Sequence, residues 1–287
     1  MSTIAAHHAF HATTSDWLCG DHTLARYHWP SPELPAKAQV LLVHGLGEHM
    51  GRYAHVAEQL RSWGFAVRGY DHYGHGRSEG PRGDMVNARG LMGDLGCMID
   101  VTRQLSLAQD KPLILLGHSL GGLITAHAVA TQLRPLDGLV LSSPALATSA
   151  NVVQKILLAL VPRLAPHLCV DNGLKAQFVA RDPQVVQAYL ADPLVHRRIS
   201  AGLAQWITQQ GPLTLAQAPQ WDMPTLLLYA QDDHLVNPAG SAQFAQRAPA
   251  CVQAHGFEGM YHEIFNDPDQ ARVFARLKDW LDAHFCA

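Results

Sequence analysis

The residue in this 287-residue sequence best placed to do chemistry is a serine between small neighbours. Ser119 stands in LLGHSLGG (115–122), with Gly117 two positions before it and Gly121 two positions after it. A nucleophile on a sharp strand-to-helix turn needs small residues at both positions, because larger side chains would clash there. Serine is also a common helix N-cap, but capping alone does not require glycine on both sides. We therefore predict that Ser119 is a nucleophile.

A serine hydroxyl is a weak nucleophile at neutral pH and needs a histidine base, which an acid in turn orients. Where a serine follows a strand in this way, the acid and then the histidine come later in the chain. Asp233, after the apolar run 225–229, is the predicted acid, and Asp232 beside it is the alternative. His262, just ahead of the last helical segment, is the predicted base. His255 also qualifies by position but falls inside an expected strand.

Acyl transfer also needs backbone N–H groups that stabilise the developing oxyanion. The amide of Leu120, directly after the nucleophile, is the first candidate. The second should come from the turn after an early strand, where HGLG (44–47) follows the apolar run 40–43. Glycines on both sides of Leu46 let the backbone turn its amide inward, so we predict Leu46 as the second donor.

The elements that must position these residues alternate between apolar strand-like runs and helical patterns. We expect an α/β fold in which a mostly parallel sheet is covered by helices on both faces, with an antiparallel hairpin at its edge in 1–39. The alternation stops after Pro144 and resumes near 225. We therefore predict a core from 1–145 and 221–287, and a mostly helical cap at 146–220 over the carboxyl edge of the sheet, where ligands bind.

Composition excludes several other functions. The formal net charge is −3 and basic residues form no block, which argues against nucleic-acid binding. Five well-separated cysteines without a CxxC pair indicate neither a zinc site nor a disulfide framework, and the eighteen histidines are too scattered to predict a metal site. With no signal-peptide pattern and no apolar run of about 18 residues, we expect a cytoplasmic protein. The oligomeric state stays open.

Several longer motifs carry a family resemblance. They are HGLGEHMGRY (44–53), YDHYGHGRSEGPRG (70–83), GHSLGG (117–122), SSPAL (142–146), YLADPLVHRR (189–198) and MYHE (260–263). The chain resembles α/β-hydrolases of the monoacylglycerol lipase and lysophospholipase group, which includes serine aminopeptidase-like enzymes. The resemblance implies an eight-stranded core, a helical cap and ester hydrolysis by Ser119, Asp233 and His262. It also implies that Arg52 lies near the alcohol end of the site; the alternative is a structural ion pair.

The expected cap bears on the substrate. Residues 152–161 form a nearly continuous apolar run with one charge, Lys155. A helix that is apolar on most sides must be buried or must touch lipid or substrate. We therefore expect an apolar acyl pocket under the cap and transient contact of the cap with a membrane surface. Related monoacylglycerol lipases often place a glutamate shortly after the SP motif, but ALATSANVV (145–153) has no acidic residue.

The predicted function is hydrolysis of lipid-like carboxylic esters, with monoacylglycerols favoured, through an acyl-enzyme and without metal or organic cofactor. A lysophospholipase or a broad carboxylesterase remains open, because the cap glutamate is missing. A prolyl-type aminopeptidase is a further alternative, although the cap has few acids to hold a substrate amino group. A catalytically silent ligand-binding module is the last alternative, and the complete set of Ser119, Asp233 and His262 argues against it.

Overall fold

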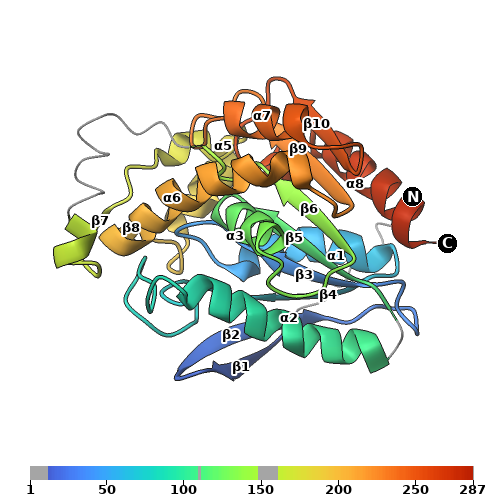
Figure 1. Ribbon diagram of the computed structural model, residues 1–287, viewed down its shortest axis with the longest axis horizontal. Helices are drawn as coiled ribbons and strands as arrows, with labels where there is room; N and C mark the ends of the chain where they lie inside the picture. The colour runs from blue at the N-terminus through green and yellow to red at the C-terminus, as the bar shows by residue number, and fades with distance from the viewer. Residues whose placement is uncertain (1–11, 109–110, 148–160, 287) are drawn as a thin grey trace, which may run out of the picture.

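An eight-stranded sheet forms the centre of the computed structural model, which describes residues 12–108, 111–147 and 161–286 (Figure 1). Its strands, in spatial order, are β1 (Thr13–Cys19), β2 (His22–Trp29), β4 (Ala66–Tyr70), β3 (Gln39–Val43), β5 (Leu113–His118), β6 (Gly138–Ser142), β9 (Thr225–Ala230) and β10 (Val252–Phe257). β2 pairs antiparallel with both β1 and β4, and all other neighbours are parallel. The mostly parallel sheet with an antiparallel edge hairpin is therefore confirmed.

Helices cover both faces of this sheet (Figure 1). α1 (Ala54–Ser62) and α8 (Gln270–Phe285) pack on one face; α2 (Gly90–Ala108), α3 (Leu120–Ala130) and α7 (Ala239–Arg247) pack on the other. Side chains alternate along each strand, so that Leu41 belongs to one core and Leu42 to the opposite core. Burial on both faces explains why the central strands are apolar throughout.

The last helix begins later than the sequence pattern predicts. The amphipathic pattern predicts a helix from about Ile264 to Phe285, but the chain forms a short 3₁₀ turn, η4 (Ile264–Asn266), and α8 starts only at Gln270. Pro268 explains the break, because the residue before a proline is disfavoured in the helical conformation. His262 therefore lies on a loop held between β10 and this 3₁₀ turn.

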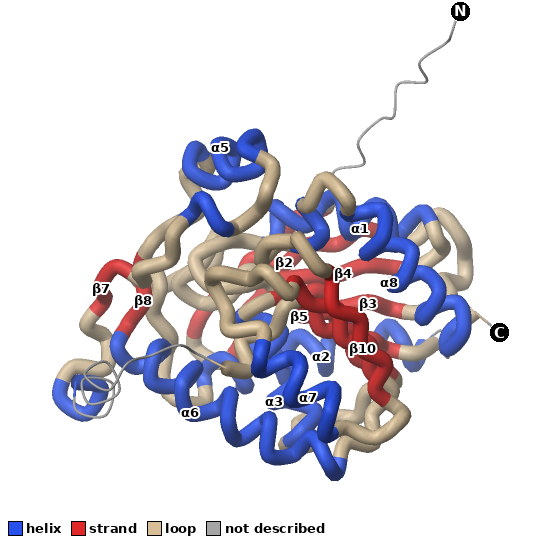
Figure 2. Tube along the Cα trace, turned by 90° about the horizontal axis from the view of Figure 1, so that it is seen from above, coloured by secondary structure: helices blue, strands red, loops and turns tan. Residues whose placement is uncertain are grey.

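Residues between β6 and β9 form the insertion. Its described elements are β7 (Cys169–Asp171), η2 (Ala176–Phe178), α5 (Pro183–Ala191), β8 (Arg198–Ser200), α6 (Ala201–Gln217) and η3 (Ala218–Gln220). β7 and β8 pair as a small antiparallel ribbon, which the mostly helical expectation did not include. Figure 2 shows α5 and this ribbon to one side of the main sheet. The apolar run 152–161, apart from its last residue, lies outside the described residues.

A disulfide joins the sheet to a helix. Cys19 at the end of β1 bonds to Cys97 in α2, with a Cα–Cα distance of 6.2 Å across 78 residues of sequence. The expectation that the cysteines form no disulfide was wrong for this pair, because only the packing of α2 beside β1 brings them together. Among the described helices, none is long and apolar enough to cross a membrane.

Candidate active site

Ser119 occupies a strained turn between β5 and α3. Its φ is +54°, a conformation that non-glycine residues rarely adopt. A Cβ at Gly117 would collide with the carbonyl oxygen of Gly121, and one at Gly121 would collide with the carbonyl oxygen of Val43. Ser119 precedes the helix, but its hydroxyl forms no capping hydrogen bond. The glycines are thus required by the turn, and the serine side chain is not used as a cap.

Asp233 and His262 meet across two loops. His262 Nδ1 donates to Asp233 Oδ2 over 2.6 Å, and both side chains are buried. The other carboxylate oxygen, Oδ1, accepts the backbone N–H groups of Leu235 and Val236 at 2.8 and 2.9 Å. These contacts fix the orientation of the Asp233 carboxylate, and the carboxylate fixes the orientation of the His262 ring. Nε2 of that ring is then left for another partner.

The electrostatics of this pair suit a base. Burial alone would lower the pKa of His262, but the Asp233 carboxylate raises it above its ordinary value. Burial alone would raise the pKa of Asp233, but the His262 ring and the two N–H groups hold it below its ordinary value. A charged acid beside a buried imidazole is the arrangement that stabilises the imidazolium formed during proton transfer.

The alternative acid, Asp232, and the alternative base, His255, take no part in this pair. Asp232 Oδ2 accepts the N–H of Gly259 over 2.6 Å, so this carboxylate secures the turn before the histidine loop. His255 lies within β10, as its expected strand position implied. The structure therefore brings together Asp233 and His262, the residues that the sequence favoured.

The turn after β3 approaches the serine closely. A Cβ on Gly45 would lie 3.1 Å from Ser119 Cβ. The Gly45 carbonyl oxygen is bonded to His44 Nδ1 over 2.8 Å, and His44 Nε2 accepts the N–H of His72 over 3.0 Å. Because a backbone N–H can only donate, His44 carries its proton on Nδ1. A trans peptide points its C=O and N–H in opposite directions, so this contact also sets the direction of the Leu46 amide.

An apolar cavity of about 200 Å³ opens at the serine. Ser119, His262, Leu46 and Leu120 line it together. The remaining lining residues are mostly apolar and come from the insertion and from the loops after β6 and β9; they are Ala145, Ala147, Asn172, Leu174, Ile199, Ala204, Ile207, Thr208, Leu235 and Val236. A chain of methylene groups would replace water against such walls favourably.

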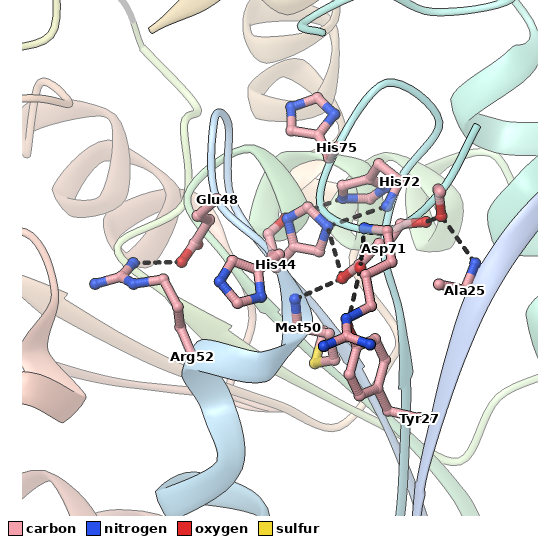
Figure 3. Close-up of polar contacts among 12 residues, drawn as sticks. Ala25, Tyr27, His44, Glu48, Met50, Arg52, Asp71, His72 and His75 are labelled. Carbon is pink, nitrogen blue, oxygen red and sulfur yellow. Dashed lines mark hydrogen bonds and ion pairs between the residues drawn. The ribbon is translucent and has the colours of Figure 1, made fainter. Parts of the chain in front are cut away.

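Arg52 lies in an ion-pair network, away from this cavity wall. Its guanidinium contacts Glu48 Oε2 at 2.6 Å and bonds both oxygens of Glu263 at 2.7 and 2.8 Å (Figure 3 shows the Glu48 contact). The side chains of all three residues are at most 11% exposed. Glu48 also accepts the N–H of Gly45 over 2.7 Å. This geometry favours the structural alternative for Arg52, with the network joining the turn after β3 to the histidine loop.

Buried Asp71 is a second anchor of that turn, and the sequence reasoning missed it. Its carboxylate accepts the N–H of Met50 at 2.7 Å, the N–H of Arg77 at 2.8 Å and the hydroxyl of Tyr27 at 3.0 Å (Figure 3). Carboxylates that accept backbone N–H groups are a common means of fixing loops. An acid directly after a buried strand, as in YDHYGHGRSEGPRG (70–83), is the sequence signal for such a contact.

The sheet order, the strained serine after β5 and the Asp233–His262 pair define an α/β-hydrolase with a serine nucleophile motif. The model of the family described as serine aminopeptidase, S33, matches residues 35–269, and the chain belongs to that family.

Named relatives agree with this assignment. The chain is 35% identical over 262 residues to a monoacylglycerol lipase of Mycolicibacterium smegmatis, covering 88% of this chain and 91% of the relative. It is 32% identical to an uncharacterized abhydrolase domain-containing protein of Dictyostelium discoideum, of which it spans 29% while 94% of this chain is covered. A crystal structure of the monoacylglycerol lipase of Paleococcus ferrophilus aligns with a TM-score of 0.82 and 34% identity, covering 91% of this chain and 99% of that one.

Proposed function

We propose that this protein hydrolyses carboxylic esters of lipid-like substrates, with monoacylglycerols favoured, through a covalent acyl-enzyme. The observation that carries the proposal is the opening of one apolar cavity onto both Ser119 and His262. The monoacylglycerol lipase relatives, which cover most of this chain, support the choice of substrate.

In the proposed mechanism Ser119 attacks the ester carbonyl while His262 Nε2 takes its proton. Asp233 holds the Nδ1–H tautomer of His262 and stabilises the imidazolium. The backbone N–H groups of Leu46 and Leu120 bind the oxyanion; Leu120 is the first residue of α3, where N–H groups have no acceptor within the helix. His262 then protonates the leaving alcohol, and a water molecule repeats the sequence on the acyl-enzyme. No step needs a cofactor.

A fluorophosphonate probe and a substrate series test this proposal. The probe should label the protein, and Ser119→Ala should abolish labelling and lower ester hydrolysis by about 10³-fold or more. Ser143→Ala is the matched control, because Ser143 also has a positive φ of +40° but follows β6 and binds the N–H of Ala230. Labelling that persists in Ser119→Ala would remove Ser119 from the mechanism. Monoacylglycerols, lysophospholipids and aminoacyl amides of matched length then identify the substrate class.

The insertion 146–220 is the cap in this proposal, and its outer surface is the proposed membrane contact. Leu164, Leu168 and Val170 are 89%, 53% and 52% exposed. Two exposed arginines are near them: Arg163 precedes Leu164, and Arg198 pairs across the ribbon with Asp171, the residue after Val170. Apolar side chains with nearby basic groups suit an anionic lipid surface. A cytoplasmic location stays a prediction from the sequence; disulfides such as Cys19–Cys97 persist more often in oxidising compartments.

Vesicle sedimentation tests the membrane contact. The double change Leu164→Asp with Leu168→Asp should reduce binding to anionic phosphatidylglycerol vesicles, because it removes apolar area and adds repulsion. Leu34→Asp is the control, since Leu34 is 87% exposed but precedes the start of β3, whereas the insertion follows the end of the parallel strand β6. Equal binding by all three proteins would contradict contact through the cap.

A further inference from the structure

The cavity at Ser119 is nearly devoid of polar side chains apart from Ser119 and His262. Asn172 and Thr208 are the two others among its lining residues. The hydroxyl of Thr208 donates to carbonyl oxygens of its own helix, those of Ala204 and Gln205, at 3.0 and 2.9 Å. Besides Ser119 and His262, Asn172 is therefore the remaining lining residue whose side-chain donor is not used within its own element.

The orientation of Asn172 is set by backbone contacts. Its Oδ1 accepts the N–H of Leu174 over 3.0 Å, and its own N–H donates to the carbonyl oxygen of Arg197 over 2.9 Å. Since a backbone N–H requires an acceptor, the oxygen of the amide faces Leu174 and Nδ2 is the other atom. Nδ2 is buried and has no hydrogen-bond partner among the described residues. Buried donors without a partner are rare, because desolvation then goes uncompensated.

This donor lies beside the turn that the mechanism uses. A Cβ added to Gly47, which follows Leu46, would lie 3.5 Å from Asn172 Nδ2. The carbonyl oxygen of Gly47 accepts the N–H of His196 over 2.8 Å, so this part of the insertion is attached to the same turn. Asn172 thus lines the cavity beside the turn after β3, and the apolar side chains of Leu174, Ile199, Ile207 and Val236 line it as well.

We propose that Asn172 is a specificity-determining residue whose Nδ2 donates a hydrogen bond to a hydroxyl oxygen in the alcohol part of the ester. This inference rests on the proposed function. The apolar wall can distinguish acyl chains but offers nothing to an alcohol, and a glycerol hydroxyl would satisfy the buried donor. An ester of a simple alkyl alcohol would leave it without a partner, and sites built around a polar contact discriminate against substrates that lack it.

The experiment compares two esters of one fatty acid, its monoacylglycerol and its methyl ester. A serine hydroxyl can accept the same backbone N–H as an asparagine side chain, although more weakly, so Asn172→Ser keeps an oxygen for the N–H of Leu174. The variant lacks the amide donor. Asn172→Ser should lower the ratio of kcat/KM for the monoacylglycerol to that for the methyl ester by about tenfold. Thr208→Val should keep the wild-type ratio, since the Thr208 hydroxyl is already bound within its helix.

The other outcomes are equally decisive. An unchanged ratio with equal losses on both esters would overturn the proposal and assign Asn172 to the ester carbonyl or to the turn. Asn172→Ala, which removes the turn contact as well, separates those two roles through its melting temperature. Wild-type protein that cleaves neither ester would instead refute the proposed function, whatever the variants do.

Discussion

At the scale of single residues, the site is an electrostatic arrangement around one imidazole. Burial is the largest single influence on the pKa of His262 and lowers it, but the charge and hydrogen bond of Asp233, together with the charges of Glu263 and Glu48, raise the pKa above its ordinary value. The neighbouring ring of His118 lies 4.7 Å away between centroids; burial and the charge on His262 lower its pKa to about 4. His118 is therefore neutral at physiological pH, so it adds no positive charge beside His262.

The pH profile should report this balance. In the proposed mechanism His262 accepts a proton only when it is neutral, so kcat/KM should rise with pH through a pKa above the ordinary histidine value near 6.5. Asp233→Asn removes the main contribution that raises this pKa, so the acid limb should move to lower pH. The plateau should also fall by about 10⁴-fold, because the tautomer is no longer held.

The neighbouring acid provides the control for that experiment. Asp232→Asn should keep the position of the acid limb, since Asp232 binds Gly259 rather than His262. If Asp232→Asn shifted the limb and Asp233→Asn did not, the assignment of the acid would be wrong.

At the scale of elements, the β5–α3 turn depends on glycines that let it approach the end of β3 closely. The Cβ of any larger residue at position 121 would meet the carbonyl oxygens of Val43 and His44, which end β3 and begin the turn that follows it. The same close approach places Ser119 against the turn that follows β3. Packing and reactivity at this point therefore have a common cause.

Two glycine-to-alanine changes separate this effect from helix propensity. Gly121→Ala should lower the free energy of unfolding by about 1–3 kcal/mol through overpacking and should also reduce esterase activity. Gly93→Ala, in α2, should raise the free energy of unfolding by roughly 0.5–1 kcal/mol. No described atom outside the helix backbone lies within 4 Å of the added Cβ, and alanine favours the helical conformation more than glycine does. Urea unfolding measures both. Equal stability of the two variants would contradict the proposed crowding.

At the scale of the whole molecule, the sheet joins parts of the chain that are distant in sequence. Arg181 of the insertion binds both oxygens of buried Asp267, ahead of α8, and the N–H of Glu263 donates to the carbonyl oxygen of Val179 over 2.8 Å. The insertion is therefore attached directly to the histidine loop. At the other side of the fold, the Cys19–Cys97 disulfide attaches the edge strand β1 to α2.

The disulfide should contribute to stability but not to catalysis. Because this cross-link joins residues 78 positions apart, it strongly restricts the conformations of the unfolded chain. Cys19→Ser with Cys97→Ser should therefore lower the free energy of unfolding by about 2–4 kcal/mol. Ester hydrolysis should persist, because neither cysteine lines the cavity at Ser119. Dithiothreitol should destabilise the wild-type protein by a similar amount and leave the double variant unaffected. Equal stability of all forms would contradict this role.

Local pattern was sufficient for much of the fold and of the site. The apolar runs 40–43 and 225–229 predicted β3 and β9, since strands buried on both faces are apolar throughout. The glycines around Ser119 predicted its turn, since strained turns exclude larger side chains. Glu48 and Arg52 lie four residues apart, a helical spacing typical of ion pairs, yet Glu263 joins them across 211 residues of sequence.

By itself, then, the sequence determined which residue types stand at the ends of which strands, because backbone strain and hydrophobic periodicity act between near neighbours. Only the tertiary structure decided what each side chain meets. It placed Arg52 between two carboxylates, joined Cys19 to Cys97, and left Asn172 Nδ2 buried beside Gly47. Such contacts depend on how helices and loops pack across the sheet, and no local pattern records that packing.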